Sequence, residues 1–402
     1  MLTKKNKDSE LQGINRLIVD ATLEVTDLVE EMHRRIVHPP FLPSTPVQHL
    51  ITTIAGVAYK NIRWSTKFIG KGADMALGRL ASAMGNIKVT EEREVMRSVL
   101  NGLIGDHLEK TDNPLKIDMQ FRYHGKAFQM DSKSIAQAYP TCNGKILLMV
   151  HGSCTNDMQW THKEHNHGTA LAKELDKTLI SLYYNSGRHI STNGQNLNTL
   201  LEKLVLHWPA PVEEIIIIAH SMGGLVARSA LHYGQQHQNT WTKKLKKMIF
   251  LGTPHHGASL EKAGNYVEVI LNAIPYAKPF ARLAKIRGAG VTDLRYGNLL
   301  DEDWQDIDQY SIQGDQRQPV PLPEQIACYT IAAVAGKETA SKTKKMLGDN
   351  LVIVKSALGK HKNPAKNLDF KNKHSFIAYE VNHLDLLSAP KVYTKIKTWM
   401  LL

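Results

Sequence analysis

From about residue 117 onward, short apolar runs alternate with segments whose apolar residues recur at helical spacing. The runs that we predict to be strands are MQFRYHGKAFQM near 120, KILLMVHG (145–152), TLISLYYNSG (178–187), EIIIIAHS ending at Ser221, LKKMIFLGTP, QIACYTIAAVAG (325–336) and SFIAYEVN (375–382). Helical patterns lie between them, for example in NLNTLLEKLVLHW (196–208) and in the last residues, SAPKVYTKIKTWMLL. Regular alternation of this kind predicts an α/β fold, a mostly parallel sheet wrapped by helices.

The first part of the chain has a different pattern. Helical spacing runs through residues 11–36, 47–89 and 91–108, and a proline-rich connector, HPPFLPSTP, separates the first two segments. We therefore expect a helical N-terminal region at residues 1–115 and an α/β domain at residues 116–402. The long stretch 258–324 between two predicted strands is expected to be an insertion that forms a cap or lid.

Charge and composition indicate which partners and which cellular compartment to expect. The chain carries a formal net charge of +12, and the segment 47–89 mixes apolar residues with lysine and arginine. This segment either packs with a solvated basic face or associates peripherally with an anionic membrane. The lysines lack interleaved aromatic residues, so we expect no nucleic-acid partner. Three cysteines without metal-type spacing, no signal peptide and no apolar run of bilayer length predict a cytoplasmic protein, at most bound at a membrane surface.

The segment EEIIIIAHSMGGLVARSA (213–230) predicts a nucleophile. A buried strand that turns abruptly into a helix lifts its corner residue, Ser221, clear of the sheet. Crowded chain segments at such a corner need small neighbours, which Ala219 and Gly223 supply. The backbone N–H of Met222 then points toward the place where an oxyanion would form.

A serine hydroxyl needs a base, and the base needs an acid, in the chain order serine, acid, histidine. Asp349 follows the strand near 326, and His383 follows the last predicted strand. We expect Asp349 to hold the tautomer of His383 and to stabilise its charged form. The rival acids are Asp369 and Asp385.

The end of the strand KILLMVHG is the expected source of a second oxyanion donor. Gly152 allows a turn that aims amides inward, and the N–H of Ser153 is the expected donor. His151 is expected to be structural rather than a base, since it precedes the serine. Cys154 is a weak alternative nucleophile.

Several other histidines require a role. His220 flanks the serine and is expected to pack at the corner, whereas His255 and His256 could line the pocket or bind a metal. We assign substrate binding to His256 and Gly152. The histidine-rich stretch THKEHNH (161–167) could hold zinc, but no ligand set at metal spacing is visible, so we expect no metal and no cofactor.

These motifs together resemble α/β-hydrolases of the lipase type. VHGS, AHSMGGLVAR, FLGTPHHG, GDNLVIVKSALG and VNHLDLLS are similar to bacterial serine lipases and to the hydrolase domain of the GPI inositol-deacylase group. The resemblance covers about residues 140–402. It implies the α/β-hydrolase fold, a triad of Ser221, His383 and Asp349, an oxyanion hole of Ser153 and Met222, and ester hydrolysis through an acyl-enzyme.

Three classes of function are compatible with the sequence. The first is a serine esterase or lipase-like hydrolase acting on a small-molecule or lipid ester. The second is an acyltransferase or thioesterase that uses the same triad. The third is a non-catalytic module that binds a lipid or a partner, and the intact order of the triad argues against it.

Overall fold

The computed structural model describes most of the chain from residue 91 onward and parts of the N-terminal region. The described residues are 12–13, 15–20, 22–23, 26–27, 30, 56–68, 71, 91–258, 288–306, 314–339, 348–349 and 351–402. The chain divides into two compact units, residues 1–89 with 110–116, and residues 90–109 with 117–402. We call them the N-terminal unit and the sheet unit.

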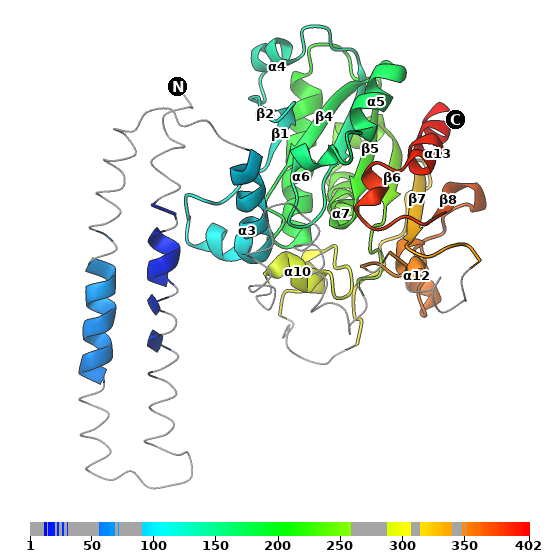
Figure 1. Ribbon diagram of the computed structural model, residues 1–402. Helices are drawn as coiled ribbons and strands as arrows, with labels where there is room; N and C mark the ends of the chain where they lie inside the picture. The colour runs from blue at the N-terminus through cyan, green and yellow to red at the C-terminus, as the bar shows by residue number, and fades with distance from the viewer. Residues whose placement is uncertain are drawn as a thin grey trace. The chain divides into compact units, whose positions relative to one another are not determined.

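The sheet unit is built on one eight-stranded sheet in the order β2-β1-β4-β3-β5-β6-β7-β8 (Figure 1). The strands are β1 Gln120–Tyr123, β2 Lys126–Ala127, β3 Lys145–Val150, β4 Thr178–Tyr183, β5 Glu214–His220, β6 Leu245–Leu251, β7 Ala327–Val334 and β8 Ser375–Tyr379. The six strands from β3 to β8 pair in parallel, whereas β1 pairs antiparallel with β4 and β2. This confirms the predicted fold class, and each predicted strand is present.

Alternate side chains of β5 are buried on opposite faces of the sheet. Ile215 and Ile217 belong to one core cluster, and Ile216 and Ile218 belong to the other. All four side chains are fully buried. A continuous apolar run is therefore needed because β5 lies in the middle of a sheet covered on both faces.

Helices cover both faces of the sheet (Figure 1). The described helices are α3 Glu91–Lys110, α4 Ser132–Ala138, α5 His167–Glu174, α6 Ile190–His207, α7 Met222–Gln236, α8 Thr240–Lys244, α10 Ala289–Asp293, α12 Val354–Ala357 and α13 Pro390–Leu401. Helices α6 and α7 bury Leu197 and Leu225 in the first core cluster. Helices α5 and α13 bury Leu171 and Trp399 in the second.

Helix α3 packs with the sheet unit, although its sequence lies in the region that we expected to be a separate N-terminal extension. Val99 and Leu103 are fully buried in the first core cluster. Gly102 lies so close to the backbone of Cys154 that an added Cβ would approach its Cα to 2.8 Å. The glycine thus allows a close approach between α3 and the loop after β3, which a side chain would prevent.

The N-terminal unit is described only in part. Residues 56–68 are helical, and so are the described residues between 12 and 30, which agrees with the predicted helices there. The guanidinium of Arg63 forms an ion pair with Asp27 at 2.6 Å and another with Glu30. Outside the described part lie the other residues of the two predicted N-terminal helices and residues 259–287, 307–313 and 340–347. Much of the predicted cap is therefore not described. Among the described residues, no helix has the length and apolar character to cross a bilayer.

Candidate functional site

The corner after β5 has the strained backbone that the sequence predicts. Ser221 adopts φ 53° and ψ −128°, which is rare for a residue with a side chain. Its N–H donates to the carbonyl of Leu251 on β6 at 2.8 Å, which anchors the corner to the next strand. Helix α7 begins at the next residue. The strain is held by the surrounding sheet, which leaves Ser221 at the carboxyl edge of the parallel strands.

The glycines behind the serine are explained by crowding. A Cβ added to Gly223 would lie 2.4 Å from the carbonyl oxygen of His151, and one added to Gly224 would lie 2.1 Å from Oγ1 of Thr253. Both distances are far below van der Waals contact. The first turn of α7 can therefore sit between the ends of β3 and β6 only if it carries no side chains there.

His383 and Asp349 lie together, although 34 positions separate them in the sequence. The Nδ1–H of His383 donates to Oδ2 of Asp349 at 2.7 Å, and both side chains are buried. The other carboxylate oxygen, Oδ1, accepts the N–H groups of Leu351 at 3.0 Å and Val352 at 2.8 Å. These two amides fix the orientation of the carboxylate toward the imidazole.

His383 also lies against the corner that carries the serine. The N–H at Nε2 of His220 donates to the carbonyl of His383 at 3.1 Å, and the two rings are 4.7 Å apart. A Cβ added to Gly252, the residue after Leu251, would lie 3.2 Å from the ring of His383. Within the described part of the chain, Nε2 of His383 is buried and has no hydrogen-bond partner. The imidazole thus has one nitrogen bound to a carboxylate and one available.

The loop after β3 approaches the serine from the other side. A Cβ added to Gly152 would lie 3.0 Å from Cβ of Ser221 and 3.2 Å from Nδ1 of His220. Ser153 follows in this loop, and Met222 follows the serine. Among the described residues, neither of their backbone N–H groups donates to a backbone carbonyl. The structure therefore brings the residues expected to form the triad and the oxyanion hole to one edge of the sheet.

The rival residues lie in other surroundings. Asp385 binds Lys163 at 2.6 Å and His162 at 3.3 Å, and Asp369 is exposed. His151 stacks on Tyr184, and burial lowers its pKa to about 4. It is thus a neutral packing residue, as its position before the serine suggested.

Cys154 is fully buried, and burial raises the pKa of its thiol to about 11. At neutral pH it is protonated, which makes it a poor nucleophile. The histidines of the 161–167 stretch bond one another and the segment around Asp385. Nε2 of His165 lies 2.9 Å from Nδ1 of His167, and Nε2 of His162 lies 3.3 Å from Oδ1 of Asp385. Among the described residues, no group of three or more side chains has a metal-binding arrangement.

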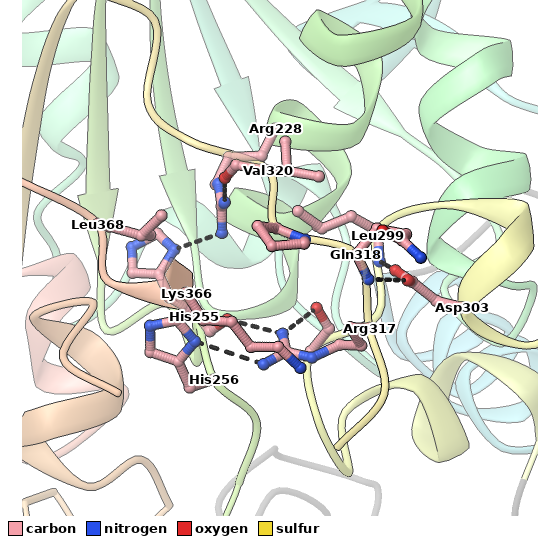
Figure 2. Close-up of a pocket in the computed structure, with 12 residues that line it drawn as sticks. Arg228, His255, His256, Leu299, Asp303, Arg317, Gln318, Val320, Lys366 and Leu368 are labelled. Carbon is pink, nitrogen blue, oxygen red and sulfur yellow. Dashed lines mark hydrogen bonds between the residues drawn. The ribbon is translucent and has the colours of Figure 1, made fainter. Parts of the chain in front are cut away.

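His256 lies in a pocket that none of Ser221, Asp349 and His383 lines. We call it the second pocket, to separate it from the candidate catalytic site. Its Nδ1 accepts from Arg317 at 3.4 Å, and its neighbour His255 accepts from Arg228 at 3.3 Å (Figure 2). Burial lowers the pKa of His256 to about 4 and holds that of His255 well below its usual value. Nothing in this geometry places His256 against a substrate at Ser221, so that assignment stays a prediction.

Sequence reasoning missed the cations of this second pocket. Arg228 stands on α7 inside the run LVARSAL, where every neighbouring residue is buried. A charged residue in the buried stretch of a helix was the available signal, because burying an unpaired charge is costly. The other contributors, Arg317 and Lys366, come from distant loops and carry no motif.

Comparisons with known proteins agree with this architecture. The family described as PGAP1-like alpha/beta domain matches residues 141–333, a range that holds Ser221 and the loop after β3. It ends before Asp349 and His383. No curated protein matches the chain.

Several solved structures match the chain at a distance. A Bacillus licheniformis lipase in its mature form is 18% identical over 64% of this chain and 90% of that chain, with a TM-score of 0.40. Aspergillus fumigatus lipase B is 11% identical over 67% and 56%, with a TM-score of 0.39. A Pyrococcus furiosus esterase is 14% identical over 64% and 83%, with a TM-score of 0.36. At these distances the matches carry no inference about function.

Proposed function

The sheet unit has the α/β-hydrolase fold and resembles the PGAP1-like hydrolases, and on that premise we propose that the protein hydrolyses carboxylic esters with Ser221 as nucleophile. The observation that carries the proposal is the buried His383–Asp349 pair at 2.7 Å, set against the strained corner of Ser221. A general base whose tautomer is held by a carboxylate is what a serine hydroxyl needs to attack a carbonyl.

The proposed reaction has two halves. In the first, Oγ of Ser221 attacks the ester carbonyl, Nε2 of His383 takes the hydroxyl proton, and the alcohol leaves with that proton. In the second, water attacks the acyl-enzyme, again with His383 as base, and the carboxylic acid is released. Asp349 stabilises the imidazolium that forms in each half. The N–H groups of Ser153 and Met222 are the proposed donors to the oxyanion.

The test is hydrolysis of a series of nitrophenyl esters of increasing acyl length by the full chain. We expect turnover in the wild type and its loss in Ser221→Ala, with folding unchanged by circular dichroism. Ser153→Ala is the matched control, because it removes a nearby hydroxyl but keeps the backbone N–H. Added alcohol acceptors reveal whether the acyl group passes to water or to another hydroxyl. Absence of wild-type turnover on every ester would refute the proposal.

We further propose that the N-terminal unit touches anionic membrane surfaces. Val57, Trp64 and Phe68 share one helical face and are exposed, the two aromatic side chains each by 66%. The aromatic rings stack at 5.3 Å, and exposed Lys60 and Lys67 stand on the same helix. Aromatic and basic residues on one interfacial helix favour binding at the headgroup level of an anionic bilayer.

Flotation of the full chain with vesicles tests the membrane proposal. We expect binding to vesicles that contain phosphatidylserine, and weaker binding to pure phosphatidylcholine. Trp64→Ala with Phe68→Ala should reduce it severalfold. Leu206→Ala is the control, since Leu206 is an apolar residue of the sheet unit that is even more exposed. Equal flotation of both variants and the wild type would contradict the proposal.

A further inference from the structure

A buried arginine without a carboxylate partner is the unusual feature of the second pocket. The side chain of Arg228 is 6% exposed. It donates to the carbonyl of Val320 at 2.6 Å and to Nδ1 of His255 at 3.3 Å, and both acceptors are neutral. Among the described residues, no carboxylate forms an ion pair with it. Burial lowers its pKa to about 9, so the guanidinium remains charged at neutral pH.

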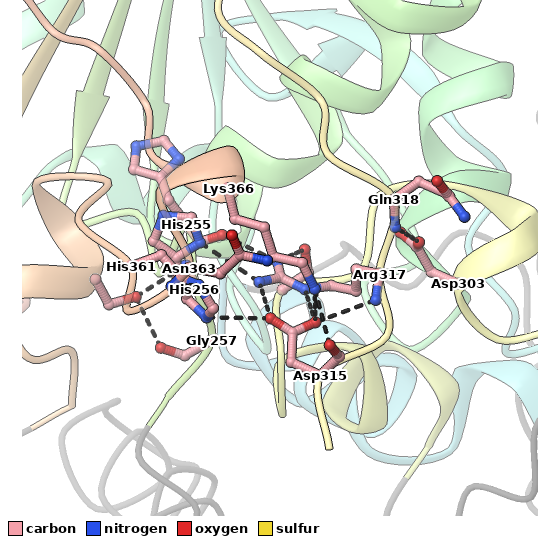
Figure 3. Close-up of polar contacts among 12 residues, drawn as sticks. His255, His256, Gly257, Asp303, Asp315, Arg317, Gln318, His361, Asn363 and Lys366 are labelled. Atoms are coloured by element: carbon pink, nitrogen blue, oxygen red, sulfur yellow. Dashed lines mark hydrogen bonds and ion pairs between the residues drawn. The ribbon is translucent and has the colours of Figure 1, made fainter. Parts of the chain in front are cut away.

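The charges around Arg228 do not balance. Asp315 binds Arg317 and Lys366, each at 2.9 Å, and also lies 3.2 Å from His361 (Figure 3). Asp303 lines the pocket as well, and its carboxylate accepts three backbone N–H groups. The histidines of the pocket, His255 and His256, are neutral because their pKa values are lowered by burial. Among the described residues, three cations thus face two carboxylates, which leaves one uncompensated positive charge.

The space beside these cations is small. Arg228, Arg317, Lys366, Asp303 and Gln318 are among the residues that line a cavity of about 20 Å³. Figure 2 shows the guanidinium groups of Arg228 and Arg317 among the lining residues, each bonded to one of the adjacent histidines. A cavity of this size holds one water or one ion of similar size.

Charge and size together point to one class of ligand. We propose that this pocket binds a single small monovalent anion of the size of chloride, held between Arg228 and the Arg317–Lys366 pair. A water molecule would fill the space but would leave the buried guanidinium without a counterion, which is costly in a low-dielectric interior. The anion would link α7 to the loop of His255 and to residues 314–320. This binding does not depend on the proposed ester hydrolysis.

The test is thermal unfolding of the full chain while chloride replaces gluconate at constant ionic strength. A ligand that binds only the folded state raises Tm with concentration. We expect Tm to rise with chloride and bromide and to respond less to phosphate. Line broadening in the chlorine NMR spectrum should report the same binding directly. A Tm that is equal in chloride and gluconate, or that rises more with phosphate, would overturn the proposal.

Variants separate this site from general salt effects. Arg228→Gln should abolish the chloride response. Lys366→Gln, which removes one positive charge from the pocket, should weaken chloride binding about tenfold or more. Asp315→Asn adds net positive charge and should tighten binding.

Arg122→Gln is the control, since Arg122 is equally buried but is paired with Glu94 and Asp157. Its chloride response should match that of the wild type. An unchanged response in both Arg228→Gln and Lys366→Gln would contradict the proposal.

Discussion

Two regions of the sheet unit place buried histidines beside charged groups, and the sign of the charge differs. In the first, His383 donates to the carboxylate of Asp349 at 2.7 Å. In the second, His255 accepts from the guanidinium of Arg228 at 3.3 Å. Both histidines are buried, and both have an Nε2 atom without a partner in the described part of the chain. The neighbour at Nδ1 is what distinguishes them.

That difference determines what each imidazole can do. A carboxylate at Nδ1 stabilises the positive charge that a general base acquires when it takes a proton at Nε2. At His255 burial opposes that charge, and the guanidinium at Nδ1 opposes it further, which is why the pKa of His255 lies well below its usual value. This difference supports the proposed proton transfer in the first region and the proposed anion binding in the second.

The largest expected effect separates the two histidines by activity. His383→Ala should lower kcat for ester hydrolysis by roughly four orders of magnitude or more, because the nucleophile loses its base. His255→Ala should leave kcat within about tenfold of the wild type. Steady-state kinetics on one nitrophenyl ester measures both. Comparable losses in the two variants would remove the functional distinction between the regions.

The next largest effect on kcat is expected from a change at the carboxylate of Asp349. Asp349→Asn should lower kcat by roughly a thousandfold or more while KM changes little, since the amide no longer holds the required tautomer or stabilises the imidazolium. Asp385→Asn is the control, because Asp385 binds Lys163 rather than His383. If the control lost as much activity as Asp349→Asn, the acid would be misassigned.

When stability is measured instead of activity, we expect His255→Ala to have a larger effect than His383→Ala. His255→Ala removes the acceptor of a buried guanidinium N–H and should lower the free energy of unfolding by about 1–3 kcal/mol from that loss alone. Among the described residues, Arg228 would then have only the carbonyl of Val320 as a hydrogen-bond acceptor. His255→Gln, whose side-chain oxygen can accept in place of Nδ1, should recover part of the loss. Urea unfolding at pH 7 gives these differences, and an alanine variant as stable as the wild type would speak against the role of His255.

The smallest effect is a pH dependence. The pKa of His151 is about 4 in the folded state because of burial, below its unfolded value of about 6.5. Between these values the unfolded chain binds more protons, so the free energy of unfolding should fall as pH falls. One such histidine contributes at most about 1.4 kcal/mol per pH unit. His151→Gln should therefore show a shallower slope than the wild type in urea unfolding between pH 6.5 and 4. Identical slopes would contradict the burial of a neutral His151.

Apolar periodicity was enough to predict the strands. The four isoleucines of β5 predict burial on both faces because no polar residue interrupts them, and the structure places them in both core clusters. The packing of α3 could not be predicted in this way. Its association with the sheet unit depends on close backbone approach at Gly102, and a single glycine in a helical pattern does not reveal its neighbour.

Residues of the candidate site were predictable where a motif constrains the backbone. Ser221, Gly223 and Gly152 follow from the need for a sharp corner and close approach, and the structure brings His383 and Asp349 together at the same edge. The second pocket was not predictable, because Arg317 and Lys366 reach Arg228 from distant loops. Its charge imbalance becomes visible only when burial and distances are known.

The most direct measurement is reaction of the folded full chain with a fluorophosphonate probe, followed by mass spectrometry of its peptides. Only a serine activated by a neighbouring base reacts readily with such a probe. We predict one adduct, on Ser221, with labelling that disappears in His383→Ala and persists in His255→Ala. No adduct on Ser221, or equal labelling in both histidine variants, would contradict the central claim that His383 and Asp349 activate this serine.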